Sequence, residues 1–262
     1  MSLTLDIGAT GMLAQQLNVD TISNNIANMT TTGYKRQRAE FQDMLYQTKV
    51  RAGASSSDAS TTIPVGIQQG MGVKTGAVYR INEQGALQST SNKFDLAIAD
   101  QGYFQVTLPS GETAYTRDGS FQMNQTGQMV TAQGYTLQPG ITIPSDAVDV
   151  TINGSGQVLV KTQGQSALTN VGQIQLAIFP NDAGLEALGN NLSIVTEASG
   201  TAVVGNPGSA GYGELRQSFL EASNVNVVEE ITALIQAQRA YEMNSKVIQA
   251  GDQMLNTVTQ LR

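Results

Sequence analysis

The stretch VVEEITALIQAQRAYEMNSKVIQAGDQMLNTVTQL, residues 227–261, decides the fold because apolar residues recur through it at a spacing of seven. Residues at this spacing lie along one side of an α-helix. At about 1.5 Å per residue the predicted helix is about 50 Å long, and no proline interrupts it. Its first heptad row contains Val227, Leu234, Tyr241, Ile248 and Leu255.

Two further rows of apolar or small residues accompany the first. The second row contains Ala233, Ala240, Val247, Met254 and Leu261. The third row contains Ala237, Gly251 and Val258. Three adjacent rows are too wide for the contact in a two-stranded coiled coil, so this helix needs more than one partner.

The beginning of the chain carries the same spacing and predicts a second helix, over residues 2 to about 29. Its heptad row contains Leu5, Met12, Val19 and Ile26. A helical hairpin within one molecule is the simpler interpretation. However, the first half of this segment contains the small residues Gly8, Ala9, Gly11 and Ala14. Since small residues let other helices approach closely, lateral association of several molecules is the alternative.

The composition indicates a folded, acidic chain. Of 262 residues, 40% are hydrophobic and 13% are charged, and the net charge is -7. This charge argues against a general nucleic-acid binder. Five of the 14 basic residues cluster in one stretch: Lys35, Arg36, Arg38, Lys49 and Arg51. A solvated face or a local subunit contact explains them better than a nucleic-acid groove.

The chain contains neither cysteine nor histidine. Disulfides, thiolate nucleophiles and the commonest transition-metal ligands are therefore excluded. The aspartates at Asp100, Asp118, Asp146 and Asp149 lie beside turn residues, where aspartate is expected without any catalytic role. We predict no catalytic residue, no cofactor and no metal site. The first residues do not form a cleavable signal peptide, and no apolar run is long enough for direct membrane insertion.

The middle of the chain is predicted to be mainly antiparallel β structure. Apolar residues alternate with a period of two from about residue 73 to 195. Three matches to one pattern, Asn82-x-x-Gly85, Asn124-x-x-Gly127 and Asn153-x-x-Gly156, predict hairpin turns. The spacing of apolar residues within residues 37–48 predicts a short amphipathic helix. Gly33 is predicted to end the first long helix. Ser223 or Asn224 is predicted to cap the last helix.

The predicted fold is therefore α+β, with long N- and C-terminal helices paired as a coiled-coil-like layer around a central β domain. Residues 1–33 pair with residues 218–262, residues 34–72 form a linker or extended inter-subunit segment, and residues 73–217 form the β domain. The Ser-rich run AGASSSDASTT within the linker cannot fold alone. We expect its residues Ala54, Ser57 and Thr62 to contact a neighbouring subunit.

Four segments resemble the family of bacterial flagellar rod and hook proteins. They are NNIANMTTTGYKR (24–36), KFDLAIADQGYFQV (93–106), AYTRDGSFQMNQTGQMVTAQGY (114–135) and QRAYEMNSKVI (238–248). Within this family the chain is most similar to the distal rod members. The resemblance implies a helical tube of identical subunits, with proximal rod proteins, the hook protein and surrounding ring proteins as neighbours. It also implies export through the flagellar secretion channel.

In such a tube the heptad row of the first helix and the first heptad row of the last helix would lie at interfaces between helices. Arg239 could bridge to a neighbouring carboxylate or carbonyl group or remain solvated. Two alternatives stay open. One is a proximal-rod or hook-type member of the same family. The other is a carbohydrate-binding or carbohydrate-active β protein of the cell wall, although the chain lacks tryptophan, the usual platform for sugars.

Overall fold

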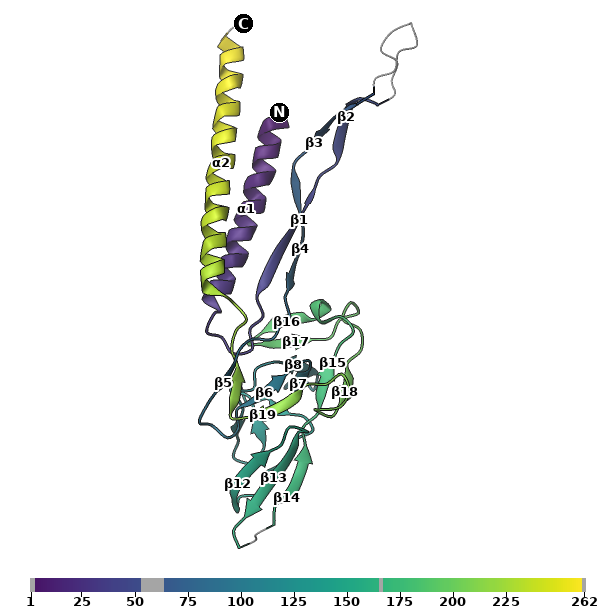
Figure 1. Cartoon of the computed structure of the whole chain (residues 1–262), viewed down its shortest axis with the longest axis vertical. Coiled ribbons are helices and arrows are strands. Elements are labelled where there is room, and N and C mark those ends of the chain that lie inside the picture. Colours follow the sequence, from purple (N-terminus) through teal and green to yellow (C-terminus); the bar gives the residue numbers. More distant parts are fainter. Residues whose placement is uncertain (1–2, 53–63, 165–166, 261–262) are drawn as a thin grey trace. The chain divides into compact units, whose positions relative to one another are not determined.

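The computed structural model describes residues 3–52, 64–164 and 167–260, and the chain divides into two compact units (Figure 1). The helical unit comprises residues 1–26, 37–79 and 226–262, and the β unit comprises residues 27–36 and 80–225. Each unit is therefore built from segments far apart in the sequence. The candidate inter-subunit residues Ala54, Ser57 and Thr62 lie outside the described residues.

Helix α2, Val227–Gln260, confirms the helix predicted from the heptad rows. Its cap is Asn226, whose side-chain oxygen accepts a hydrogen bond from the Val228 amide at 3.2 Å. The prediction of Ser223 or Asn224 as the cap is wrong, because the chain becomes helical only after both residues. Asn226 is an equally good capping residue and lies directly before the first turn.

Helix α1, Leu3–Ala27, confirms the predicted N-terminal helix. It ends before Gly33, and the Thr31 amide donates to the Asn28 carbonyl at 3.2 Å in the turn that follows. The prediction that Gly33 ends the helix is therefore wrong. It has a φ of +66°, and a Cβ there would lie 2.8 Å from the backbone carbonyl carbon of Arg117. Glycine is needed at this position for both reasons.

Residues 37–43 and 46–50 form strands, so the short amphipathic helix predicted for residues 37–48 is wrong. Strand β1 (Gln37–Asp43) pairs with β4 (Val73–Arg80), and β2 (Tyr46–Val50) pairs antiparallel with β3 (Ile67–Gly70). The first residues of β1 alternate between partly buried and exposed, which is the period of a strand. The apolar residues at helical spacing were too few to outweigh pairing with the downstream strands β3 and β4.

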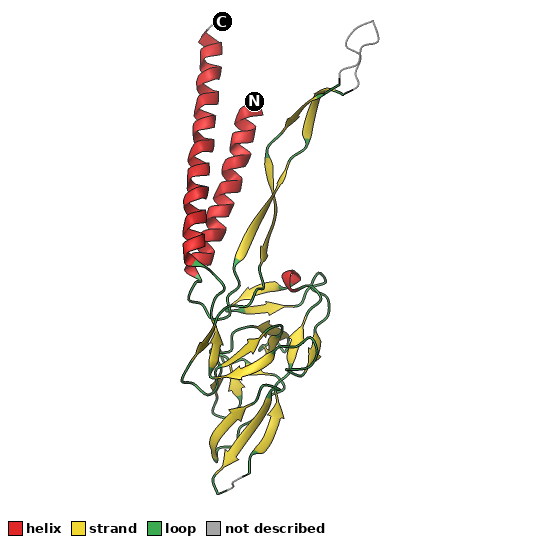
Figure 2. Ribbon diagram, in the orientation of Figure 1, coloured by secondary structure: helices red, strands yellow, loops and turns green. Residues whose placement is uncertain are grey.

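Within its described residues, the β unit contains one large sheet, a three-stranded sheet and two strand pairs (Figure 2). The large sheet has the order β16-β17-β8-β7-β11-β10-β9, with β15 and β18 attached through β7. Its strands are β7 (Tyr103–Thr107), β8 (Thr113–Thr116), β9 (Gln122–Met123), β10 (Met129–Val130), β11 (Thr136–Leu137), β15 (Leu176–Ile178), β16 (Glu186–Gly189), β17 (Leu192–Ile194) and β18 (Val203–Gly205).

The smaller sheets use the remaining strands. The three-stranded sheet contains β12 (Ala147–Ile152), β13 (Gln157–Thr162) and β14 (Thr169–Gln173). The two pairs join β6 (Leu96–Ala99) to β19 (Glu214–Gln217), and β5 (Leu87–Ser89) to β20 (Phe219–Glu221). A 3-10 turn, η1 (Asp182–Gly184), precedes β16. The described pairs run antiparallel, which confirms the predicted sheet type.

The core of the β unit lies between these sheets. Phe104 and Phe121 are fully buried and meet edge to face with ring centroids 5.1 Å apart. Leu96, Val158 and Leu176 from three other strands belong to the same buried cluster. Burying such side chains contributes about 1.5–3 kcal/mol each, so the β unit has a hydrophobic core of its own.

Two of the three predicted hairpin turns are confirmed. Gly127 and Gly156 have φ values of +79° and +81°, and their amides donate to the carbonyls of Asn124 and Asn153. The prediction of a hairpin turn at the third match, Asn82-x-x-Gly85, is wrong. Gly85 is buried instead, and its amide donates to the Glu221 carboxylate at 2.9 Å.

Candidate functional site

Helices α1 and α2 lie side by side in the helical unit (Figure 1). Their close approaches join Leu5 to Gly251, Gly8 to Ile248, and Gly11 to Asn244. Residue numbers rise along one helix as they fall along the other, so the two helices run antiparallel. Farther along, Asn25 Nδ2 donates to Glu230 Oε2 at 3.2 Å in a buried hydrogen bond.

Glycine makes this approach possible. A Cβ on Gly8 would lie 2.7 Å from Ile248 Cγ1, and one on Gly11 would lie 2.8 Å from Asn244 Nδ2. Favourable contacts between carbon atoms lie at about 3.5–4.0 Å. Larger residues at either position would therefore force a neighbouring side chain to move.

The side of α2 that faces α1 is centred on the third heptad row, with Ile248 of the first row beside it. Ala237 is 3% exposed and Gly251 is buried. Glu230 is 7% exposed and lies seven positions before Ala237. The contact within one molecule thus combines small and polar residues with Leu5 and Ile248, and it leaves many of the large apolar side chains of α2 exposed.

These large side chains form an exposed apolar surface on α2. Its members are between 41% and 73% exposed: Val228, Ile231, Ile235, Tyr241, Met243, Val247, Met254 and Leu255. Leu13 of α1 is 67% exposed as well. Monomeric proteins rarely expose extended apolar patches, and those they do expose commonly mark interaction sites.

The candidate interface residues fall into three groups. The first group is partly buried and contains Leu5, Met12, Val19, Ile26, Val227, Leu234 and Ile248. Tyr241 and Leu255 are 42% and 41% exposed and belong to the exposed apolar surface. Arg239 is exposed. Leu5 and Ile248 meet the opposite helix, whereas Val19 and Tyr241 line a shallow groove with Gln16, Gln238 and Glu242.

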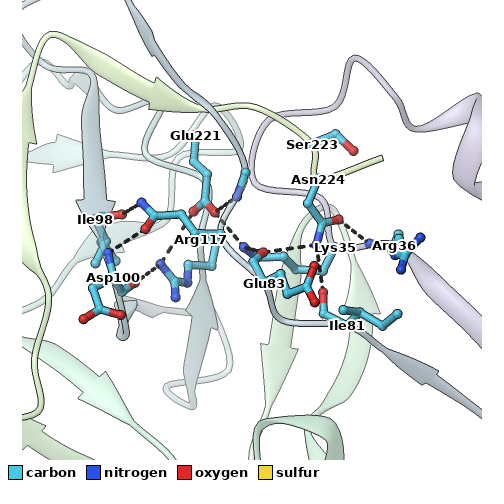
Figure 3. Close-up of polar contacts among 12 residues, drawn as sticks. Lys35, Arg36, Ile81, Glu83, Ile98, Asp100, Arg117, Glu221, Ser223 and Asn224 are labelled. Atoms are coloured by element: carbon cyan, nitrogen blue, oxygen red, sulfur yellow. Dashed lines mark hydrogen bonds and ion pairs between the residues drawn. The ribbon is translucent and has the colours of Figure 1, made fainter. Parts of the chain in front are cut away.

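A polar site lies in the β unit, in segments that include the residues shortly after α1 and shortly before α2. Figure 3 shows its side chains. Asn224 occupies its centre. Its side-chain oxygen accepts from the Arg36 amide at 2.7 Å, and its Nδ2 donates to the carbonyls of Ile81 and Glu83 at 2.9 and 3.1 Å. One amide group thus joins three separate segments of the chain.

Beside Asn224 lies a buried ionic group formed by Lys35, Arg117 and Glu221, which we call the charged cluster (Figure 3). Lys35 Nζ lies 2.6 Å from Glu221 Oε1 and also donates to the Glu83 carbonyl at 2.7 Å. Arg117 Nη1 lies 3.6 Å from Glu221 Oε2. The three side chains are at most 7% exposed, so their charges interact with little screening by solvent.

Burial lowers the pKa of Lys35, while the neighbouring Glu221 carboxylate opposes that change. The interpretation of Lys35 as part of a solvated basic face is therefore wrong. Local sequence could not reveal its partner, because Glu221 lies 186 positions away. The quoted segment NNIANMTTTGYKR contains Lys35, but the pattern alone did not show that this lysine is buried.

The described residues hold no group of three or more acidic side chains that could bind a metal ion. Within the same ranges, no helix is both long and apolar enough to cross a membrane. What the fold presents is a pair of antiparallel helices with an exposed apolar surface and a β unit that fixes the segments next to both helices. These features are typical of a structural subunit of a larger assembly.

Comparison with known proteins identifies the assembly. Three family models match: flagella basal body rod protein at residues 5–35, flagellar hook protein FlgE/F/G D1 domain at residues 97–160, and flagellar basal body rod FlgEFG protein C-terminal at residues 216–261. The chain belongs to the flagellar basal-body rod protein family. It is a structural component of the flagellar basal body and not an enzyme.

Individual relatives agree with this assignment. The flagellar basal-body rod protein FlgG of Caulobacter vibrioides is 60% identical over 98% of both chains. In Bacillus subtilis, FlgG is 40% identical over the full length of both chains, whereas the flagellar hook-basal body complex protein FlhP is 30% identical over 94% of each. These matches favour a rod protein over the other members of the family and over a carbohydrate-binding protein.

Proposed function

We propose that this chain is a subunit of the flagellar distal rod and polymerises into a helical tube. The tube transmits torque from the motor to the hook, and its lumen serves as an export channel. The observation that carries this proposal is the exposed apolar surface of α2, which a single molecule leaves in contact with solvent. The similarity to rod proteins over the whole chain supports it.

Helix contacts between subunits account for this surface. Burying each large apolar side chain contributes about 1.5–3 kcal/mol, and a polymer repeats every contact along its length. The small residues at the contact between α1 and α2 let helices approach closely, which favours a coiled-coil-like layer of paired helices. In such a layer, the exposed members of the first heptad row of α2, Tyr241 and Leu255, lie against neighbouring subunits.

The finer points of the proposal concern neighbours and location. We infer that proximal rod proteins, the hook protein and the surrounding rings contact this subunit, and that it spans the periplasm. Arg239 is exposed and available to bridge to a neighbouring subunit. The run that includes Ala54, Ser57 and Thr62 remains a sequence-based proposal for an inter-subunit contact. Export without a cleaved signal peptide is consistent with a cysteine-free chain that forms no disulfide on the way.

The decisive experiment replaces Ile235 of the exposed apolar surface with aspartate. Ile235 is 47% exposed, so Ile235→Asp leaves the monomer folded. In the tube it places a carboxylate in an apolar contact, which costs several kcal/mol per subunit. We expect electron microscopy of the concentrated protein to show tubes for the original chain and none for the variant.

Gln236→Asp is the matched control, because it introduces the same charge at the next, already polar and exposed position. It should retain most of the assembly. Tubes of normal length from Ile235→Asp would rule out the exposed apolar surface as the interface.

A further inference from the structure

Two methionines of α2 are more exposed than any other methionine in the described part of the chain. Met243 is 66% exposed and Met254 is 60% exposed. Met123 of the β unit follows at 51%, whereas Met129, in the core of that unit, is 1% exposed. The side chains of Met243 and Met254 are therefore open to small solutes when the molecule is alone.

Both methionines lie on one side of α2. They are eleven positions apart, which corresponds to about three turns of an α-helix. Between them lie Val247, which is 45% exposed, and Ala250, which is exposed as well. Residues three or four positions apart share a face of a helix, so these four residues form a continuous apolar stripe, which we call the methionine stripe. The contact with α1 leaves this stripe uncovered.

The methionine stripe overlaps the surface that we assign to contacts between subunits, because Met243, Val247 and Met254 belong to the exposed apolar surface of α2. In a free subunit their side chains are in contact with solvent. In a tube they lie against a neighbouring subunit. A small reagent that modifies these methionines can therefore act before assembly and not after it.

The composition makes methionine the oxidation-sensitive residue type of this chain. The sequence contains nine methionines but no cysteine, histidine or tryptophan. Hydrogen peroxide converts the methionine thioether to a sulfoxide. In this step the O–O bond breaks, one oxygen atom bonds to sulfur, sulfur gives up two electrons, and the peroxide is reduced to water. The product is a polar side chain in place of a flexible apolar one.

We propose that Met243 and Met254 form an oxidation site for hydrogen peroxide that controls assembly, a role that rests on the proposed function. Oxidation of the free subunit places a sulfoxide oxygen at each end of the methionine stripe. Burying a polar oxygen in an apolar contact without a hydrogen-bond donor is unfavourable, so the oxidised subunit does not enter the tube. Because reductases convert methionine sulfoxide back to methionine, the block is reversible.

The first test treats the dilute full-length monomer with hydrogen peroxide and removes the peroxide with catalase before assembly. Peptide mass spectrometry should find the sulfoxide at Met243 and Met254 while Met129 stays reduced, because oxidation follows exposure. The protein concentration needed for polymerisation, measured by sedimentation, should rise about tenfold. Circular dichroism of the treated monomer at 222 nm should be unchanged. Loss of this helical signal, or an unchanged concentration for polymerisation, would overturn the proposal.

A double variant, Met243→Leu with Met254→Leu, locates the effect. Leucine has a volume similar to that of methionine and costs little in apolar contacts, but peroxide does not oxidise it. This variant should polymerise equally well before and after treatment. A variant that loses its tubes on treatment would show that oxidation acts elsewhere and would refute the oxidation site.

Met29→Leu with Met123→Leu is the matched control. It makes the same change at two methionines of the β unit, which are 43% and 51% exposed. This control should remain as sensitive to peroxide as the original chain. A control that polymerises normally after treatment would assign the effect to the β unit and count against Met243 and Met254.

Two measurements on the original chain complete the test. Reductases for both sulfoxide epimers should restore polymerisation of the oxidised monomer. Peroxide added to finished tubes should leave Met243 and Met254 reduced, because neighbouring subunits cover them. No recovery with the reductases, or equal oxidation in tubes and in monomers, would overturn the proposal. An untreated chain that forms no tubes would refute the proposed function and the oxidation site with it, whereas tubes that form regardless of oxidation would refute the oxidation site alone.

Discussion

Glu221 shows how much can depend on one carboxylate. It accepts hydrogen bonds from Lys35 Nζ and from the Gly85 amide, and it is the counter-charge for Arg117. Glu221→Gln leaves two cations buried with no negative partner. We expect this change to lower the free energy of unfolding of the β unit by about 3–5 kcal/mol, measured by urea denaturation.

Glu197→Gln serves as the control for this prediction. Glu197 is an exposed carboxylate of the same unit, so its loss should change stability by no more than about 0.5 kcal/mol. Equal stability of the Glu221→Gln and Glu197→Gln proteins would contradict the role given to the charged cluster.

Asp182 provides a prediction about pH. Burial raises its pKa, although Arg117 and Lys35 partly offset this. The folded protein thus binds the proton more tightly than the unfolded chain, so ionisation at neutral pH costs stability, and this cost disappears as the pH falls below the unfolded pKa of about 3.9. Asp182→Asn should be more stable than the original at pH 7, with the difference shrinking toward pH 4. Urea denaturation at several pH values tests this, and a less stable variant at pH 7 would contradict it.

At the level of single residues, the sequence predicts turns better than long-range partners. Asn124 and Asn153 were correctly predicted as turn residues because asparagine and a glycine three positions later form such turns locally. Asn224 was predicted as a helix cap by the same local logic. Its actual partners at Arg36, Ile81 and Glu83 lie more than 140 positions away, where no local pattern can indicate them.

Among the elements, the contact between α1 and α2 tests the role of glycine. An alanine at Gly11 meets only the flexible end of Asn244, whereas an alanine at Gly8 meets Ile248 Cγ1, closer to the backbone. Alanine gains up to about 1 kcal/mol of helix propensity over glycine, but overpacking costs about 1–3 kcal/mol. Gly11→Ala should therefore raise the melting temperature of the helices, and Gly8→Ala should lower it.

Circular dichroism of the full-length chain at 222 nm measures both melts. The two variants control for each other, because both add one methyl group to the same helix. A shift of the same sign in both would show that helix propensity alone decides the outcome and that the close approach at Gly8 does not matter.

The helices and strands that the sequence predicts correctly are those with a regular spacing of apolar residues. The heptad rows predicted α1 and α2, and alternation predicted the strands around Leu96, Phe104 and Leu176. Residues 37–48 were mistaken for a helix because their strand partners, within 67–80, follow only after a long intervening segment. The heptad rows also could not show which row faces α1, since that depends on how closely the backbones approach.

For the whole molecule, the two units should differ in resistance to protease. The β unit encloses a hydrophobic core, whereas the helical unit leaves large apolar side chains of α2 in solvent. Local openings that protease can exploit are therefore easier in the helices. Brief digestion of the dilute monomer with a non-specific protease should remove residues within 3–26 and 226–260 first, leaving a core that retains residues 27–36 and 80–225.

Mass spectrometry of the digest identifies the fragments, and concentrated, assembled protein is the control, in which the helices should be protected. Simultaneous loss of both units in the dilute monomer would show that they unfold together.

The pair formed by Lys35 and Glu221 also sets the order of events during folding, because it closes a loop of 186 positions. High contact order slows folding, since the entropy of closing the loop must be lost before the contact is gained. A chain that emerges N-terminus first presents Lys35 long before its partner exists. The segment next to the first helix is therefore fixed only after residue 221 has emerged, so chains interrupted earlier remain without it and cannot compete with complete subunits for a place in the polymer.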